Sequence, residues 1–181
     1  MPLNAALVAD VILAKAAARG ERVSNMKLQK LLYYAQGEHL AATGELLFDD
    51  RIKAWVKGPV VPGIWHRHRE NGFLDLPEPI QIPTIPAFYD RTVTAVLDRY
   101  LSFTAEQLSE MTHRESPWLE ARTRNQRSAA ISEATLKAHF SQIRSHRREE
   151  RRIDVAPATA KARAAGFIRR HGGLFQRLAS S

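Results

Sequence analysis

The chain has 181 residues, of which 44% are hydrophobic and 25% are charged, a composition typical of a water-soluble protein with one core. It contains no cysteine, which excludes disulfide frameworks, thiolate metal sites and cysteine nucleophiles and favours a reducing compartment. The sequence shows neither a signal peptide nor an apolar run long enough for a membrane span, so we expect a cytoplasmic protein with no membrane partner.

The positive charge is concentrated at the end of the chain. Residues 1–143 contain 17 basic and 16 acidic residues, whereas residues 144–181 contain 10 basic and 3 acidic ones. The body is therefore nearly neutral, and the tail supplies most of the net charge of +8. We expect this tail to face an acidic partner or surface.

Helical periodicity dominates the sequence and predicts a mainly α fold. An apolar stripe that follows Asn4, a plausible N-cap, predicts a helix over residues 5–18. A second helix is predicted from Asn25, as its N-cap, to about Ala42, with Gly44 in the stop position. The core face of this helix contains Leu28, Leu31, Leu32, Ala35 and His39.

The apolar period changes from 3.6 to 2 after the second helix. Alternation over residues 52–56 predicts a short strand or β-arm, which Gly58 and Pro59 end. A short helix is predicted over residues 62–70. Prolines interrupt residues 73–87, which we expect to form an extended loop.

Four further helices complete the predicted core. One covers residues 89–100. The next begins at Thr104, which forms a capping-box pattern with Gln107. Pro117 fits the first turn of another helix, and Ser132 caps the last one.

Two groups of side chains are candidates for binding a partner. On the second helix, Lys27, Lys30 and Tyr34 share a strip beside the core face, and Tyr33 lies beyond the face on the other side. Tyrosine and basic residues are good interface anchors, although their stems and rings also cover neighbouring core surface. Beyond Ile143 the apolar spacing fails. The charged run that follows offers four arginines: Arg147, Arg148, Arg151 and Arg152.

His113 is flanked by Glu110 and Glu115, which superficially offers an acid/base pair for catalysis. A helix end that uses Thr, His and Glu side chains to satisfy free backbone groups explains the same pattern better. No nucleophile elbow accompanies these residues, so a hydrolase built around His113 and Glu115 is the less favoured hypothesis.

Metal, cofactor and nucleic-acid sites have weaker support in the sequence. His66 and His68 lie two apart on a predicted helix and point away from each other. No phosphate-binding glycine loop or metal motif is present, so we predict no metal ion and no cofactor. A nucleic-acid-binding regulator that uses the arginine-rich tail is the main alternative function.

Three blocks of sequence carry a family resemblance. Asn25-Met26-Lys27-Leu28-Gln29-Lys30-Leu31-Leu32-Tyr33-Tyr34-Ala35-Gln36-Gly37 resembles the signature of the Panacea domain found in SocA-like antitoxins. Trp55-Val56-Lys57-Gly58-Pro59-Val60 and the segment from Leu108 to Trp118 resemble two further elements of that domain. The motif residues with a structural role would be Asn25, Leu28, Gln29, Leu31, Trp55, Gly58, Pro59, Thr112, His113, Glu115, Pro117 and Trp118.

The resemblance implies an antitoxin rather than an enzyme. Its fold would be mainly α, a compact helical domain with a small β-hairpin or β-arm, covering residues 5–143 and followed by a basic C-terminal extension over residues 144–181. The partner would be a cognate protein toxin, similar to SocB. The implied mechanism is that of a proteolytic adaptor, which holds the toxin and delivers it to the protease ClpXP.

Overall fold

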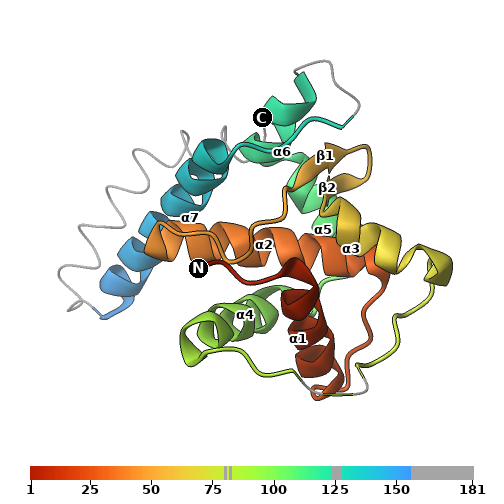
Figure 1. The fold of residues 1–181 in the computed structure, drawn as a ribbon. Helices are drawn as coiled ribbons and strands as arrows, with labels where there is room; N and C mark the ends of the chain where they lie inside the picture. Colours follow the sequence, from red (N-terminus) through yellow and green to blue (C-terminus); the bar gives the residue numbers. More distant parts are fainter. Residues whose placement is uncertain (80, 82, 124–127, 156–181) are drawn as a thin grey trace. The chain divides into compact units, whose positions relative to one another are not determined.

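A computed structural model of the chain describes residues 1–79, 81, 83–123 and 128–155 (Figure 1). Within these residues the fold is mainly α with a small antiparallel β-hairpin, as predicted. The elements in chain order are α1 (Ala5–Ala17), α2 (Asn25–Thr43), β1 (Lys53–Trp55), β2 (Gly58–Val60), α3 (Pro62–Arg67), η1 (Arg69–Asn71), α4 (Ala87–Tyr100), α5 (Ala105–His113), α6 (Ser116–Thr123) and α7 (Glu133–Val155).

Helix α2 is the central element of the fold, with α1, α3, α4, α5 and the β-hairpin packed around it (Figure 1). Almost every side chain from Asn25 to Leu40 is buried, including polar ones. The expectation of a helix with a single core face is therefore wrong, because neighbours cover this helix on several sides. Its N-cap is Ser24, whose Oγ accepts a hydrogen bond from the backbone N–H of Lys27, and Gly44 ends it with a φ of 82°.

The β-hairpin includes the two residues that were expected to end the strand. Gly58 pairs with Trp55, and Pro59 pairs with Ala54, so the chain turns at Val56 and Lys57 and returns as β2. The other edge of β1 bonds to the segment after α6, since the Ala54 N–H donates to the Ala129 carbonyl at 2.8 Å. Strand β1 is therefore held from both sides.

The later helices begin where the capping signals predict. Thr104 and Gln107 form the predicted capping box at the start of α5. Pro117 lies in the first turn of α6, and the Ser132 hydroxyl accepts a hydrogen bond from the Thr135 N–H at the start of α7. Helix α7 continues through the arginine-rich run to Val155.

Residues 1–140 form one compact unit, and a second unit begins at Ser141 within α7. The predicted domain limits, 5–143 and 144–181, stay predictions, and most of the second range lies outside the described residues. In the described part of the chain, every helix lacks the length and hydropathy that crossing a membrane requires.

Candidate partner-binding site

The three sequence blocks that carry the family resemblance meet in one region of the fold. The first half of α2 packs against β2 and α5, and α5 and α6 pack against the hairpin. Side chains from the blocks form a largely buried polar network between these elements.

Glu115 joins the α5–α6 corner to α2. The Tyr33 hydroxyl donates to its Oε2 at 2.6 Å, and the Tyr34 hydroxyl donates to its Oε1 at 3.0 Å. Burial raises the pKa of Glu115 to about 7, although the two tyrosine hydrogen bonds act to lower it. Burial and the adjacent carboxylate raise the pKa of both tyrosines, so both hydroxyls keep their protons.

His139 of α7 lies on the other side of this carboxylate. Its Nε2 is 3.6 Å from Glu115 Oε2, and its Nδ1 is 3.3 Å from the Ser116 Oγ. Burial lowers the pKa of His139, which favours a neutral ring beside Glu115.

Lys30 of α2 bonds to the backbone of strand β2. Its ammonium donates to the Pro59 carbonyl at 3.3 Å, and the side chain is only 1% exposed. Burial lowers its pKa to about 7. Gly58 has a φ of +101°, and a Cβ placed there would lie 2.6 Å from Lys30 Cε and 3.0 Å from Thr112 Oγ1, so only glycine fits.

Three side chains of the α5–α6 corner hold the hairpin turn by its carbonyl groups. The Ser109 hydroxyl donates to the Lys57 carbonyl at 3.1 Å, and His113 Nε2 donates to the Val56 carbonyl at 3.1 Å. The Trp118 indole N–H donates to the Trp55 carbonyl at 3.0 Å. Each carbonyl from Trp55 to Lys57 therefore has a side-chain donor, which fixes the turn.

His113 and Glu115 have separate partners in this arrangement. The His113 imidazole bonds to the hairpin and stacks against Trp118, with ring centroids 4.2 Å apart, whereas Glu115 bonds to the tyrosines. Burial lowers the pKa of His113, and nearby Lys30 and Arg122 lower it further. Both side chains link separate elements of the fold here.

The remaining motif residues also connect elements. Asn25 donates through Nδ2 to the Trp65 carbonyl at 3.1 Å and accepts from the Gln29 amide at 3.0 Å. The Gln29 oxygen accepts from the Val61 N–H at 2.9 Å. Leu28, Leu31 and Pro117 are buried in the core.

Of the two interpretations of the strip on α2, interface anchors or cover for neighbouring core surface, the burial of its side chains favours the second. Tyr33 and Tyr34 are fully buried, Lys30 is 1% exposed, and Lys27 is 8% exposed. The hairpin and the α5–α6 corner supply polar partners for Lys30 and the two tyrosines, whereas Lys27 forms an ion pair with Glu21 at 3.9 Å. Partner binding through these four residues stays a prediction, and their burial argues against it.

The tail arginines lie on the described part of α7. Arg148, Arg151 and Arg152 are exposed, Arg147 is half-buried, and Arg152 forms an ion pair with Glu149 at 3.5 Å. Their role in partner binding also stays a prediction.

Sequence reasoning missed an exposed apolar surface at the hairpin turn. We define the tip surface as Val56, Lys57, Phe73 and Leu74. The Lys57 ammonium lies 5.2 Å from the centroid of the Phe73 ring, which brings the turn beside the loop after η1. Phe73 and Leu74 directly follow the Asn71-Gly72 turn, and two large apolar residues in a turn region are the signal that could have found this surface.

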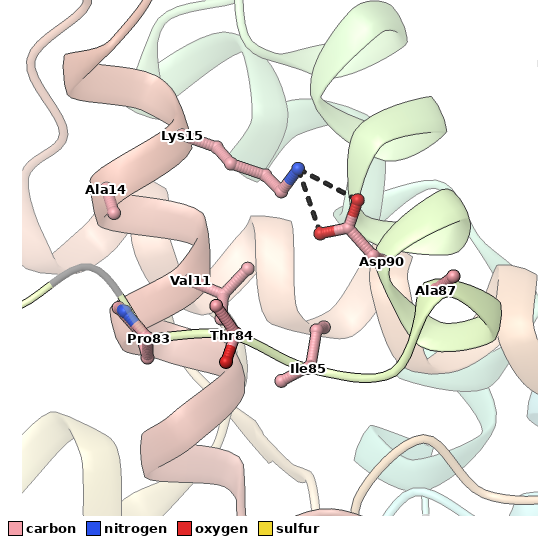
Figure 2. Close-up of a pocket in the computed structure, with 8 residues that line it drawn as sticks. All are labelled: Val11, Ala14, Lys15, Pro83, Thr84, Ile85, Ala87 and Asp90. Atoms are coloured by element: carbon pink, nitrogen blue, oxygen red, sulfur yellow. Dashed lines mark hydrogen bonds and ion pairs between the residues drawn. The ribbon is translucent and has the colours of Figure 1, made fainter.

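A separate pocket of about 390 Å³ lies between α1 and the start of α4 (Figure 2). The Lys15 ammonium projects across it to the Asp90 carboxylate at 2.9 Å and to the Thr94 hydroxyl at 3.1 Å. Val11 and Ile85 are among its apolar lining residues. The pocket lies outside the three sequence blocks. No group of three His, Asp or Glu side chains in the described part of the chain is placed to hold a metal ion.

Comparison with known proteins identifies the family. Residues 28–119, about half of the chain, match the family described as antitoxin SocA-like, Panacea domain. The chain belongs to the SocA-like Panacea family. The matched residues run from α2 into α6 and contain all three blocks except Asn25, Met26 and Lys27 at the start of the first.

The chain is also similar to the curated protein Antitoxin SocA of Caulobacter vibrioides (strain NA1000 / CB15N). The two are 41% identical over 70 residues, which is 39% of this chain and 37% of that protein. The match therefore spans little more than a third of the relative's length. No solved structure gave a significant match. Membership of the Panacea family supports an antitoxin role.

The burial of Glu115 predicts that the stability of the fold decreases as the pH rises toward 7. The burial of Lys30 predicts that the stability increases as the pH rises above 7. For Glu115, a pKa raised from 4.5 to about 7 means that the folded protein holds this proton more tightly than the unfolded chain. Its stabilising contribution is complete below pH 4.5 and falls by about 3 kcal/mol as the pH rises through 7. For Lys30, a pKa lowered from 10.5 to about 7 gives a contribution that is complete above pH 10.5 and is lost as the pH falls through 7.

Denaturant unfolding from pH 5 to pH 9 measures both effects. Glu115→Gln should flatten the fall in unfolding free energy between pH 5 and 7, and Lys30→Met should flatten the rise above pH 7. If both variants keep the pH slopes of the natural sequence, these two groups are not the source of the dependence.

Proposed function

We propose that this chain neutralises a cognate protein toxin by binding it and delivering it to the ClpXP protease. The observation that carries the proposal is the Panacea family match over residues 28–119. The toxin would be a SocB-like protein, and the chain would act in the cytoplasm, where this protease works. Such an adaptor needs no cofactor and no catalytic residue.

A proteolytic adaptor needs two binding surfaces, because it contacts its cargo and its protease together. The described residues offer two that differ in chemistry: the apolar tip surface on the body and the exposed arginines of α7. We assign the body to the toxin and the arginines to the protease. Tethering raises the local concentration of the toxin at the protease, so two modest affinities suffice.

Co-purification with the product of the neighbouring gene tests the first half of the proposal. That product, expressed with this chain, should elute with it as one complex on size exclusion. A neighbouring product that is folded and soluble but elutes separately at micromolar concentrations would contradict toxin binding.

A nucleic-acid-binding regulator is a second candidate, favoured by the exposure of Arg148, Arg151 and Arg152 on α7. Phosphate contacts by these arginines would make DNA affinity fall steeply with salt. Duplex binding with that salt dependence, abolished by deletion of residues 144–181, would support this function. DNA binding would be compatible with the first proposal if the antitoxin regulates its own expression.

A further inference from the structure

The tip surface gathers three of the most exposed large apolar side chains in the described part of the chain. Val56 is 71% exposed, Leu74 is 73% exposed, and Phe73 is 85% exposed. The contact between the Lys57 ammonium and the Phe73 ring joins the hairpin turn to the following loop. Large apolar groups clustered in solvent mark an interaction site, whereas single ones do not.

The hairpin part of this surface is held in place before any partner arrives. Ser109, His113 and Trp118 bond to the backbone carbonyl groups of the turn. The Val56 and Lys57 side chains take no part in these bonds and are exposed to solvent. The buried Lys30 ammonium also donates to the Pro59 carbonyl of β2. A rigid turn loses little conformational freedom on binding, which favours affinity.

The hairpin turn itself carries one charged side chain, the exposed Lys57. Within the described residues, Lys57 and Arg114 are exposed and form no ion pair, and the Arg122 guanidinium lies 5.7 Å from the centroid of the Trp118 ring. Glu110 is an exposed carboxylate on the same helix as the turn's supports. Two further exposed carboxylates are close in sequence, since Asp75 directly follows Leu74 and Glu70 precedes the Asn71-Gly72 turn. The Lys57 ammonium lies within the tip surface, over the Phe73 ring, and has no carboxylate partner in the described part of the chain, which favours a partner segment that carries a carboxylate beside its apolar side chains.

The side chains of the tip fit a protein better than a nucleic acid. Nucleic-acid bases stack on aromatic rings and guanidinium planes, whereas Val56 and Leu74 are aliphatic. Protein interfaces bury a few large apolar anchors within a polar rim, and Phe73 with its two aliphatic neighbours offers such anchors.

We infer that the tip surface is the contact site for the toxin and receives a toxin segment that combines apolar side chains with carboxylates. This inference rests on the proposed function, because it names the surface through which that binding occurs. It replaces the buried α2 strip as the site on the body.

Paired variants test the surface against matched controls, with the neighbouring gene's product as the probe. Phe73→Ser combined with Leu74→Ser should weaken the affinity for that product at least tenfold, and Lys57→Glu should weaken it several-fold with a reduced salt dependence. The controls are Phe88→Ser, at a 45% exposed phenylalanine of α4, and Arg91→Glu, at an exposed arginine of the same helix. These controls should change the affinity less than twofold.

The outcomes separate the inference from the function on which it rests. If the natural chain binds the product and the tip variants bind equally well, the inference is wrong and the function stands. If the natural chain does not bind the product, both the inference and the proposed function are wrong. Melting temperatures close to that of the natural chain show that the tip variants are folded, as expected for exposed side chains.

Photo-crosslinking gives a second readout that does not depend on loss of binding. A benzophenone amino acid at position 73 should crosslink to the toxin, and the crosslinked peptide should contain Asp or Glu beside apolar residues. The same group at position 88 should give little crosslinking. Equal yields at both positions, or a basic crosslinked peptide, would overturn the assignment.

Discussion

Glu115→Leu is expected to lower the free energy of unfolding by about 2–5 kcal/mol at pH 5, because it leaves two buried tyrosine hydroxyls without an acceptor. A buried donor that loses its partner destabilises a protein by about 1–3 kcal/mol. At pH 5 the carboxyl group is protonated in the folded state, so its loss brings no relief from a buried charge. Urea unfolding monitored by circular dichroism measures the change.

Removal of the tyrosine hydroxyls provides the control for this variant. Tyr33→Phe and Tyr34→Phe, combined with Glu115→Leu, should recover most of the lost stability, because no unpaired donor is left in the core. Both rings would keep their aromatic contacts with Phe140. A triple variant as unstable as Glu115→Leu alone would show that the hydroxyl bonds do not carry the effect.

Gly37→Ala is the second substitution with a large expected effect. A Cβ at this position would overlap Cε2 and Cδ2 of Phe140 and lie 2.7 Å from its Cζ. The Phe140 ring has little room to move, since Tyr33 and Tyr34 pack edge-on against it with centroids 5.5 and 6.0 Å away. Overpacking should therefore lower the free energy of unfolding by about 2–3 kcal/mol, despite the better helix propensity of alanine.

Gly63→Ala is the matched control for this packing effect. Gly63 also lies in a helix, but its nearest neighbour to an added Cβ is Asp50 Oδ1 at 3.9 Å, an ordinary contact. The stability should stay the same or rise by up to about 1 kcal/mol. Thermal melts of both variants measure this difference in stability. Similar melting temperatures for the two would mean that the contact with Phe140 does not explain the glycine of the family signature.

Local signals in the sequence were sufficient to place most helices. The capping box at Thr104 and the left-handed cap at Gly44 both appear in the structure as predicted. These signals act within one turn of the chain, so no tertiary information is needed to interpret them. The alternating pattern predicts only the first strand of the hairpin, because Gly58 and Pro59 are typical of a strand end, although Pro59 pairs with Ala54 within β2.

The burial of α2 could not be predicted from its own sequence. Lys30, Tyr33 and Tyr34 look like surface residues by periodicity, and their partners, Pro59 and Glu115, lie far along the chain. Their burial therefore depends on tertiary contacts between three separate blocks. The tip surface was missed for the same reason, since only the folded chain brings Lys57 beside Phe73.

Degradation of the neighbouring gene's product by purified ClpXP and ATP, with and without this chain, tests the central claim most directly. The account predicts that the product is degraded only when this chain is present, at a rate that saturates as the chain's concentration rises. A product that binds this chain but stays intact in the complete reaction would contradict the adaptor mechanism and leave an antitoxin that acts by binding alone.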